Sequence, residues 1–219
     1  MEIEFWQQRW QDNQTGFHLD QVNPCLTDFW SSLGLHNSAE ILVPMCGKSL
    51  DMVWLSKQGH KILGVECSEK ALNEFFSEQS LPRVIDSVDD FQSFKKDNYN
   101  LLLGDFFKLE KKRLSGVAGV YDRASLVALP ENMRRNYVNL LINNLPKTVS
   151  ILLVTLDYDQ SIMSGPPFSL SNEEVYSLYS GDFNISLLNE VDVLSEQPRF
   201  KERGLTYMIE RVYKIVRES

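Results

Sequence analysis

Gly47, Glu66 and Asp105 each stand at the end of an apolar run in this chain. Glycine permits a tight turn and lets a ligand approach the backbone without a Cβ in the way. A carboxylate about 20 residues further on, as at Glu66, can accept hydrogen bonds from the two hydroxyls of a ribose. A second carboxylate, Asp105, can accept one from the amine of an adenine. These residue types and their spacing indicate a nucleoside site.

Each of the three residues also has an ordinary structural interpretation. Gly47 can serve a simple turn between a strand and a helix, Glu66 can face solvent, and Asp105 can cap a turn. Gly47-Lys48-Ser49 resembles the end of a phosphate-binding loop, but the glycine that such a loop needs five residues earlier is absent, and so is a GxGxxG motif. The small residues that follow Glu66 favour the binding interpretation there.

Other residues extend the possible site. Arg123 either pairs with Asp122 or fixes a carboxylate in bidentate geometry. Phe106, beside Asp105, offers an aromatic surface near the adenine. Trp10 either anchors the N-terminal segment to the core or places its ring beside a sulfonium, a cation–π arrangement. A nucleoside site without a diphosphate loop favours S-adenosyl-L-methionine over a dinucleotide.

The apolar pattern predicts the elements that position these residues. Strand and helix patterns alternate over much of the chain, which indicates an α/β fold with a mostly parallel sheet covered on both faces. The last two strands follow one another closely and predict an antiparallel hairpin at the sheet edge. We expect helices over 24–34, 49–58, 69–79, 130–145 and 171–178, and strands over 39–45, 61–66, 99–103, 119–122, 150–156, 184–191 and 205–216.

Composition narrows the classes of function. The 219 residues carry a net charge of −8, which argues against nucleic acid as a partner. No apolar run reaches the ~20 residues that span a membrane, and no signal peptide is visible, so we expect no membrane partner. The 3 cysteines form no CxxC motif, which favours a reducing, cytoplasmic compartment and no metal site.

Several motifs together resemble the bacterial thiopurine S-methyltransferases. The resemblance rests on Phe5-Trp6-x-x-Arg9-Trp10, Gly16-Phe17-His18, Asn23-Pro24, the block from Val43 to Leu55, Gly59-His60, Gly64-Val65-Glu66, Tyr121-Asp122-Arg123 and Gly165-Pro166-Pro167-Phe168. It implies a single-domain, Rossmann-like class I methyltransferase with a seven-stranded sheet and S-adenosyl-L-methionine as methyl donor. Residues 1–37 would form an N-terminal helical lid, and residues 38–219 the core.

The resemblance also implies roles for individual residues. The positions that bind the cofactor in the family match Trp10, Met45, Glu66 and Arg123, while those against its adenosine part match Asp105 and Phe106. Phe17 matches a residue that packs on the thiopurine, and Arg199 matches an arginine near the substrate. The chain departs from the common family pattern at Met45, where leucine is usual, and at Ser125, where alanine is usual.

The implied reaction is attack by a thiolate on the methyl group of a sulfonium. Aromatic and heterocyclic thiols ionise near neutral pH, so no strong base is required, and the sequence shows no Ser/His/Asp or Cys/His arrangement. His18 is a candidate base, and Arg123 a candidate to stabilise the thiolate. We expect a monomer that acts on small thiols and on selenium or tellurium compounds. The alternatives are a nicotinamide-dependent oxidoreductase and a non-catalytic module that binds S-adenosyl-L-methionine.

Overall fold

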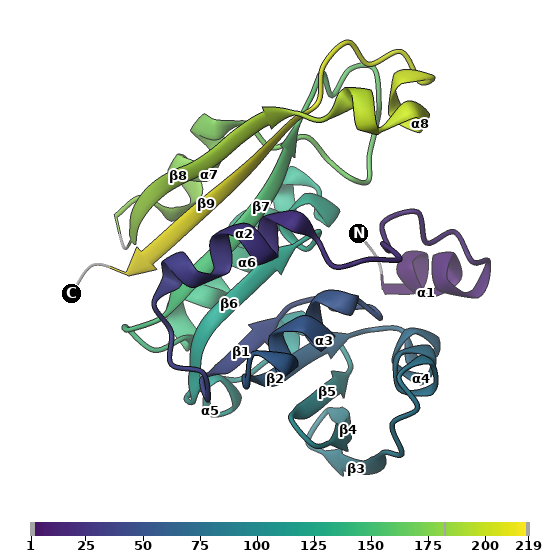
Figure 1. Ribbon diagram of the computed structural model, residues 1–219, viewed down its shortest axis with the longest axis vertical. Coiled ribbons are helices and arrows are strands. Elements are labelled where there is room, and N and C mark those ends of the chain that lie inside the picture. Colours follow the sequence, from purple (N-terminus) through teal and green to yellow (C-terminus); the bar gives the residue numbers. More distant parts are fainter. Residues whose placement is uncertain (1–2, 182, 218–219) are drawn as a thin grey trace.

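The computed structural model describes residues 3–181 and 183–217, which are built around one nine-stranded sheet (Figure 1). Its strand order is β3-β4-β5-β2-β1-β6-β7-β9-β8. The strands β5, β2, β1, β6 and β7 run parallel to one another, and the strands at both edges pair antiparallel. The strands are β1 (Glu40–Val43), β2 (Lys61–Glu66), β3 (Val84–Val88), β4 (Phe91–Lys96), β5 (Tyr99–Leu103), β6 (Val117–Arg123), β7 (Ser150–Asp157), β8 (Phe183–Asp192) and β9 (Ile209–Arg217).

The sheet therefore has nine strands rather than the seven that the resemblance implied. Strands β3 and β4 form a hairpin that extends the sheet beyond β5. Their two-residue turn contains Asp89, whose φ of 54° lies in the left-handed region that aspartate tolerates. Neither β3 nor β4 was predicted. Every residue of β3 except Val88 is exposed, and β4 (Phe-Gln-Ser-Phe-Lys-Lys) contains only two apolar residues, so neither segment has the apolar run by which the other seven strands were predicted.

Helices cover both faces of the sheet. One apolar cluster joins the sheet to α6 (Glu131–Asn144) and α7 (Asn172–Tyr179), and the other joins it to α2 (Pro24–Phe29), α3 (Leu50–Lys57) and α4 (Glu69–Glu78). The remaining helices are α1 (Ile3–Gln11), α5 (Lys111–Leu114) and α8 (Pro198–Lys201), with 3₁₀ turns at Trp30–Leu33, Phe106–Lys108, Leu126–Ala128 and Leu194–Glu196.

The helices begin where short polar side chains can cap them. The Ser49 side chain accepts from the Asp51 backbone N–H, and the Ser68 side chain accepts from the Ala71 N–H. These two caps fix the turns that follow β1 and β2. In the described part of the chain, no helix is both long and apolar enough to cross a membrane.

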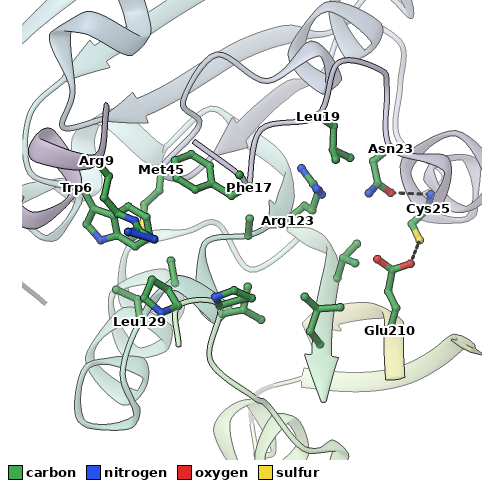
Figure 2. A pocket seen from close by; sticks show the side chains of 18 of the residues that line it. Trp6, Arg9, Phe17, Leu19, Asn23, Cys25, Met45, Arg123, Leu129 and Glu210 are labelled. Atoms are coloured by element: carbon green, nitrogen blue, oxygen red, sulfur yellow. Dashed lines mark hydrogen bonds between the residues drawn. The ribbon is translucent and has the colours of Figure 1, made fainter. Parts of the chain in front are cut away.

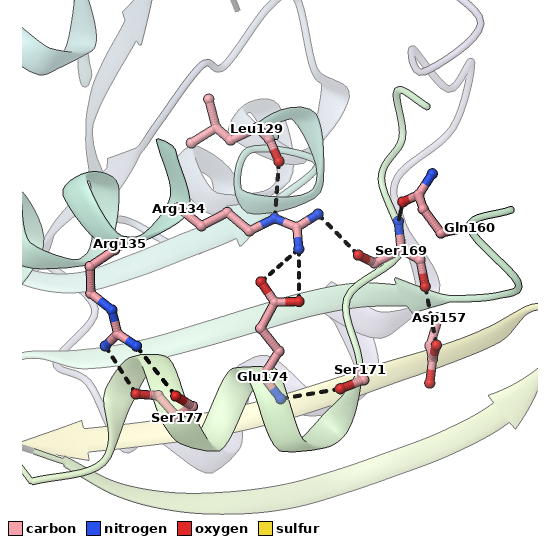
Figure 3. A network of polar contacts seen from close by, with 9 residues as sticks. All are labelled: Leu129, Arg134, Arg135, Asp157, Gln160, Ser169, Ser171, Glu174 and Ser177. Carbon is pink, nitrogen blue, oxygen red and sulfur yellow. Dashed lines mark hydrogen bonds and ion pairs between the residues drawn. The ribbon is translucent and has the colours of Figure 1, made fainter. Parts of the chain in front are cut away.

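A polar network holds the segment after β7 against α6 (Figure 3). Buried Arg134 contacts both carboxylate oxygens of Glu174, at 2.7 and 2.8 Å, and donates to the carbonyls of Leu129 and Ser169. The Ser169 hydroxyl in turn donates to Asp157 at the end of β7. The network joins α6 to α7 and so fixes the loop between β7 and α7, whose two prolines, Pro166-Pro167, line the cavity described next.

Candidate active site

A cavity of about 1280 Å³ lies along the ends of β5, β2, β1 and β6 and continues to β7 and β9 (Figure 2). This volume exceeds the ~300–1,000 Å³ typical of a site for one small ligand, so it has room for a cofactor and an acceptor together. One end, here called the β1–β2 end, is lined by Met45, Glu66, Asp105 and Phe106; the other, the β7–β9 end, is lined by Cys25, Val154, Leu156, Met208 and Glu210.

Glu66 is held in place by backbone groups. Its Oε2 accepts from the Gly47 N–H at 2.9 Å and its Oε1 from the Ser68 N–H at 2.8 Å. Burial raises the pKa of Glu66, and these two hydrogen bonds oppose the rise because they favour the carboxylate. Oε1 also accepts from the Cys67 thiol at 3.4 Å, while Oε2 keeps a second lone pair. Because a thiol is a weak donor, a ribose hydroxyl can replace it on Oε1, and Glu66 can then accept hydrogen bonds from two ribose hydroxyls.

The turn after β1 contains two residues in the left-handed region. The φ angles are 45° at Met45 and 52° at Gly47, and such values are uncommon for a residue other than glycine. A Cβ at Gly47 would lie 2.9 Å from Cζ2 of Trp10, so only glycine lets this indole pack on the turn. Met45 and Trp10 line the cavity, whereas Gly47 lies beneath Trp10 and does not.

Asp105 and Phe106 follow β5 at the same end of the cavity. Asp105 caps the next turn, since its Oδ1 accepts from the Phe107 N–H at 2.9 Å, and it also lines the cavity. Both of its sequence-based interpretations therefore fit the geometry. Phe106 is buried, with its ring centroid 5.2 Å from that of Tyr137, so it belongs to the core as well as to the cavity wall.

Arg123 ends β6 and projects into the cavity between its two ends (Figure 2). It makes no hydrogen bond or ion pair with any residue in 3–181 or 183–217. The alternative of a structural pair with Asp122 is not realised, because buried Asp122 accepts from the Tyr137 hydroxyl at 2.7 Å and from the Leu126 N–H at 3.2 Å. The Arg123 guanidinium is thus available to an anionic group of a ligand.

Phe17, from the segment after α1, and Arg199, from α8, lie on the cavity wall. The Phe17 ring packs edge-to-face on Trp10 and Trp6, with centroid distances of 5.5 and 5.6 Å. Arg199 donates to the carbonyl oxygen of Gly16 and lies over the Phe200 ring at 4.5 Å. Both residues line the cavity, and Arg199 joins the segment after α1 to the segment before β9.

His18 is half-buried, but it is absent from the described residues that line the cavity. Burial lowers the pKa of His18, and the positive charges of Lys48 and Arg123 lower it further. Because the His18 imidazole does not line the cavity, it does not contact a methyl acceptor bound there in this arrangement.

The structure adds three residues that sequence reasoning gave no role. Arg9 lines the cavity and has a buried Nε with no hydrogen-bond partner among the described residues; its place one residue before Trp10 in the aromatic motif was the available signal. Cys25 and Glu210 are 185 residues apart in sequence, yet the Cys25 thiol donates to Glu210 Oε1 at 3.1 Å. Burial and this carboxylate raise the pKa of the Cys25 thiol, and no local pattern predicts the pair.

Comparison with known proteins identifies the family. A family model described as Thiopurine S-methyltransferase (TPMT) matches residues 1–218. The thiopurine S-methyltransferase of Pseudomonas entomophila is 45% identical over 217 residues, which cover 99% of this chain and 100% of that protein. The chain belongs to the thiopurine S-methyltransferase family. The thiopurine S-methyltransferase of Shewanella frigidimarina is 43% identical over 219 residues and is likewise matched along its whole length.

Solved structures agree on the fold. An S-adenosyl-L-methionine-dependent methyltransferase from Anabaena variabilis superposes with a TM-score of 0.67 at 16% identity, over 99% of this chain and 95% of that one. The 1,6-didemethyltoxoflavin N1-methyltransferase of Burkholderia thailandensis, which was solved with its acceptor and S-adenosylhomocysteine, gives 0.65 at 14% identity, over 98% and 87%. The family and the fold confirm the prediction of a Rossmann-like methyltransferase that uses S-adenosyl-L-methionine. Neither alternative, the oxidoreductase or the non-catalytic module, finds support.

Proposed function

We propose that this protein methylates the sulfur of aromatic and heterocyclic thiols, thiopurines among them. The observation that carries the proposal is one continuous cavity with Glu66 at its β1–β2 end, a mostly apolar wall that also holds Glu210 at its β7–β9 end, and the unpaired Arg123 between them. Such a cavity can hold a nucleoside donor and an aromatic acceptor at the same time. Membership of the family supports the choice of sulfur as the atom methylated.

The β1–β2 end fits the donor. When bound, S-adenosyl-L-methionine supplies a methyl group on a sulfonium, which a thiolate can displace. We assign the ribose hydroxyls to Glu66 and the adenine to the wall made by Asp105, Phe106 and Met45. Arg123, with no partner in the described part of the chain, binds an anionic group, and the indole of Trp10 covers the turn that contains Gly47.

The acceptor lies toward the β7–β9 end in this proposal. Phe17 packs on its aromatic ring, and Arg199 lies near it. The positive charge of Arg123 stabilises the thiolate, so the chain needs no general base and His18 needs no catalytic role. Alignment of the two reactants and exclusion of water by Trp10 and Phe17 supply the rate enhancement, worth about 7–11 kcal/mol in well-oriented reactions.

We further propose that residues 1–37 act as a lid on a core formed by residues 38–219. Helix α1 is tied to the core by few polar contacts. The Gln7 side chain donates to the Cys67 carbonyl at 3.1 Å, and Lys70 donates to the Asn13 side chain at 2.8 Å. Lys70 also donates to the Gln11 carbonyl at 3.3 Å. Exposed polar contacts such as these can break when ligands enter and leave, whereas buried Trp10 packs on the turn at Gly47 and α2 packs on the sheet, so the moving part of the lid is α1 with the segment after it.

An assay with methyl-labelled donor tests the proposed function. The panel holds a thiopurine, thiophenol, benzeneselenol, tellurite and, as a comparison, an aliphatic thiol. We expect label on the thiopurine and thiophenol, and label on the selenol would extend the acceptors to softer chalcogens. Binding of the donor without transfer to any of these acceptors would contradict the proposal.

We also propose a monomer that acts in the cytoplasm on a small molecule rather than on a nucleic acid. The proposed site combines residues from both ends of this chain, such as Phe17 and Glu210. The 3 cysteines, Cys25, Cys46 and Cys67, are unpaired, as expected where thiols stay reduced. Light scattering coupled to gel filtration should give the mass of one chain, 25.3 kDa.

A further inference from the structure

Glu210 occupies a distinctive position on the cavity wall. Strand β9 pairs antiparallel with β7, and Leu156 of β7 is opposite Glu210. Arg123 is at the carboxyl end of β6, and Leu156, opposite Glu210, is near the carboxyl end of β7. Since the sheet order is β6-β7-β9, Glu210 lies on the same side of the sheet as Arg123, where the parallel strands end, but two strands further from Glu66. The next residue of β9, Arg211, forms ion pairs with Asp157 and Glu190 and does not line the cavity. Glu210 is therefore the charged residue that β9 contributes to the cavity wall.

The Glu210 carboxylate is only partly used within the protein. Its Oε1 accepts from the Cys25 thiol, a weak donor, and its Oε2 has no hydrogen-bond partner among residues 3–181 and 183–217. No ion pair joins it to Arg123 in the described part of the chain. A cavity that holds an unpaired cation and a carboxylate with one unused oxygen fits a ligand that presents one group to each.

We propose that Glu210 selects the acceptor by accepting a hydrogen bond from an N–H next to the reactive sulfur. The inference rests on the proposed function, in which Arg123 faces the sulfur. The favoured class is the heterocyclic thiones, whose sulfur-bearing carbon is also bonded to a ring N–H. They bind as the neutral thione: the sulfur takes the methyl group, S-adenosyl-L-homocysteine leaves, and the N–H proton passes along the hydrogen bond to Glu210 and then to water, which gives a neutral S-methyl product. An aryl thiolate lacks that donor, and its negative charge is repelled by the Glu210 carboxylate.

A matched pair of acceptors tests this assignment. 2-Thiopyridone has a ring N–H beside its sulfur, and thiophenol has a ring of the same size without nitrogen. For Glu210→Gln we expect KM for 2-thiopyridone to rise about tenfold, because the amide oxygen can still accept but lacks the charge that strengthens this hydrogen bond. KM for thiophenol should stay unchanged or fall, because the repulsion is gone, while the affinity for S-adenosylhomocysteine stays within twofold.

Glu190→Gln is the control, since it makes the same change in the same hairpin at an exposed residue that does not line the cavity. It should leave the ratio of the two KM values unchanged. Equal changes for both acceptors in Glu210→Gln, or none, would overturn the proposal. If the wild-type protein methylates neither acceptor, the proposed function fails. The role of Glu210 is then decided by calorimetry, which measures how tightly 2-thiopyridone binds to the S-adenosylhomocysteine complexes of the wild type and of Glu210→Gln. A loss of affinity there supports the role, and unchanged affinity refutes it.

Discussion

The two ends of the cavity are built in different ways. At the β1–β2 end, the binding group Glu66 is buried and held by two backbone N–H groups from turns that directly follow strands. At the β7–β9 end, the carboxylate of Glu210 is held only by the thiol of Cys25, a residue from a distant part of the chain, and Arg123, between the two ends, has no polar partner in the described part of the chain. A site fixed by backbone suits one invariant ligand, the donor, and a site of long side chains suits acceptors that differ in shape.

Glu66→Ala should produce the largest effect and should act only at the β1–β2 end. It removes the proposed ribose acceptor and leaves the Gly47 and Ser68 N–H groups without partners. We expect affinity for S-adenosylhomocysteine to fall by about 1–3 kcal/mol, as measured by titration calorimetry. Glu69→Ala, an exposed change in the first turn of α4, is the control. Unchanged affinity in Glu66→Ala would remove this carboxylate from the site.

Gly47→Ala tests whether Trp10 and the turn after β1 form one packed unit. The left-handed backbone alone costs about 1 kcal/mol for alanine, and the contact with Trp10 adds to it. The matched control is Gly34→Ala, since Gly34 has a φ of 64° and a Cβ added there would meet nothing within 4 Å. In urea unfolding we expect Gly47→Ala to lose at least about 1 kcal/mol more than Gly34→Ala. Equal losses would show that Trp10 is free to move away.

Phe17→Ala should weaken binding of the acceptor and leave binding of the donor unchanged. Phe17 packs on Trp6 and Trp10 and, in the proposal, on the acceptor ring. Loss of an aromatic contact worth about 0.5–1.5 kcal/mol predicts a severalfold higher KM for a thiopurine. The affinity for S-adenosylhomocysteine should hardly change. The reverse pattern, with weaker donor binding and an unchanged acceptor KM, would place Phe17 at the β1–β2 end instead.

His18→Gln should have the smallest effect on catalysis, with kcat changed less than twofold for thiophenol. Its pKa is lowered in the folded state, so the folded protein binds fewer protons than the unfolded chain. Stability is therefore lost as the pH falls through about 6.5, the unfolded pKa. Urea unfolding at pH 7.5 and 5.5 should show a smaller loss in His18→Gln than in the wild type. A large fall in kcat would restore His18 as a base.

The difference between the two ends of the cavity also explains which parts of the site the sequence could predict. The turn at Gly47 and the carboxylate at Glu66 lie within one strand–helix–strand unit, where residue spacing determines position. The helix of residues 24–34 was predicted as one element, but it ends as a 3₁₀ turn before Gly34 in the left-handed region. Strands β3 and β4 were missed because neither contains an apolar run: the side chains of β3 mostly face solvent, and those of β4 include only two apolar residues.

Long-range pairs were beyond the reach of local pattern. Glu210 lay inside the strand predicted for 205–216, but which face of that strand meets the cavity depends on its register with β7. The contact between Glu210 and Cys25 depends further on how α2 packs on the sheet. Neither register nor packing is encoded in the spacing of nearby residues, so the β7–β9 end became visible only in three dimensions.

A crystal structure of the protein with S-adenosylhomocysteine tests the central claim most directly. We expect both ribose hydroxyls within hydrogen-bond distance of Glu66, the adenine beside Asp105 and Phe106, and the sulfur directed toward Arg123 and the β7–β9 end. An adenosyl group bound at the β7–β9 end, beside Cys25 and Glu210, would contradict the division of the cavity on which the account depends.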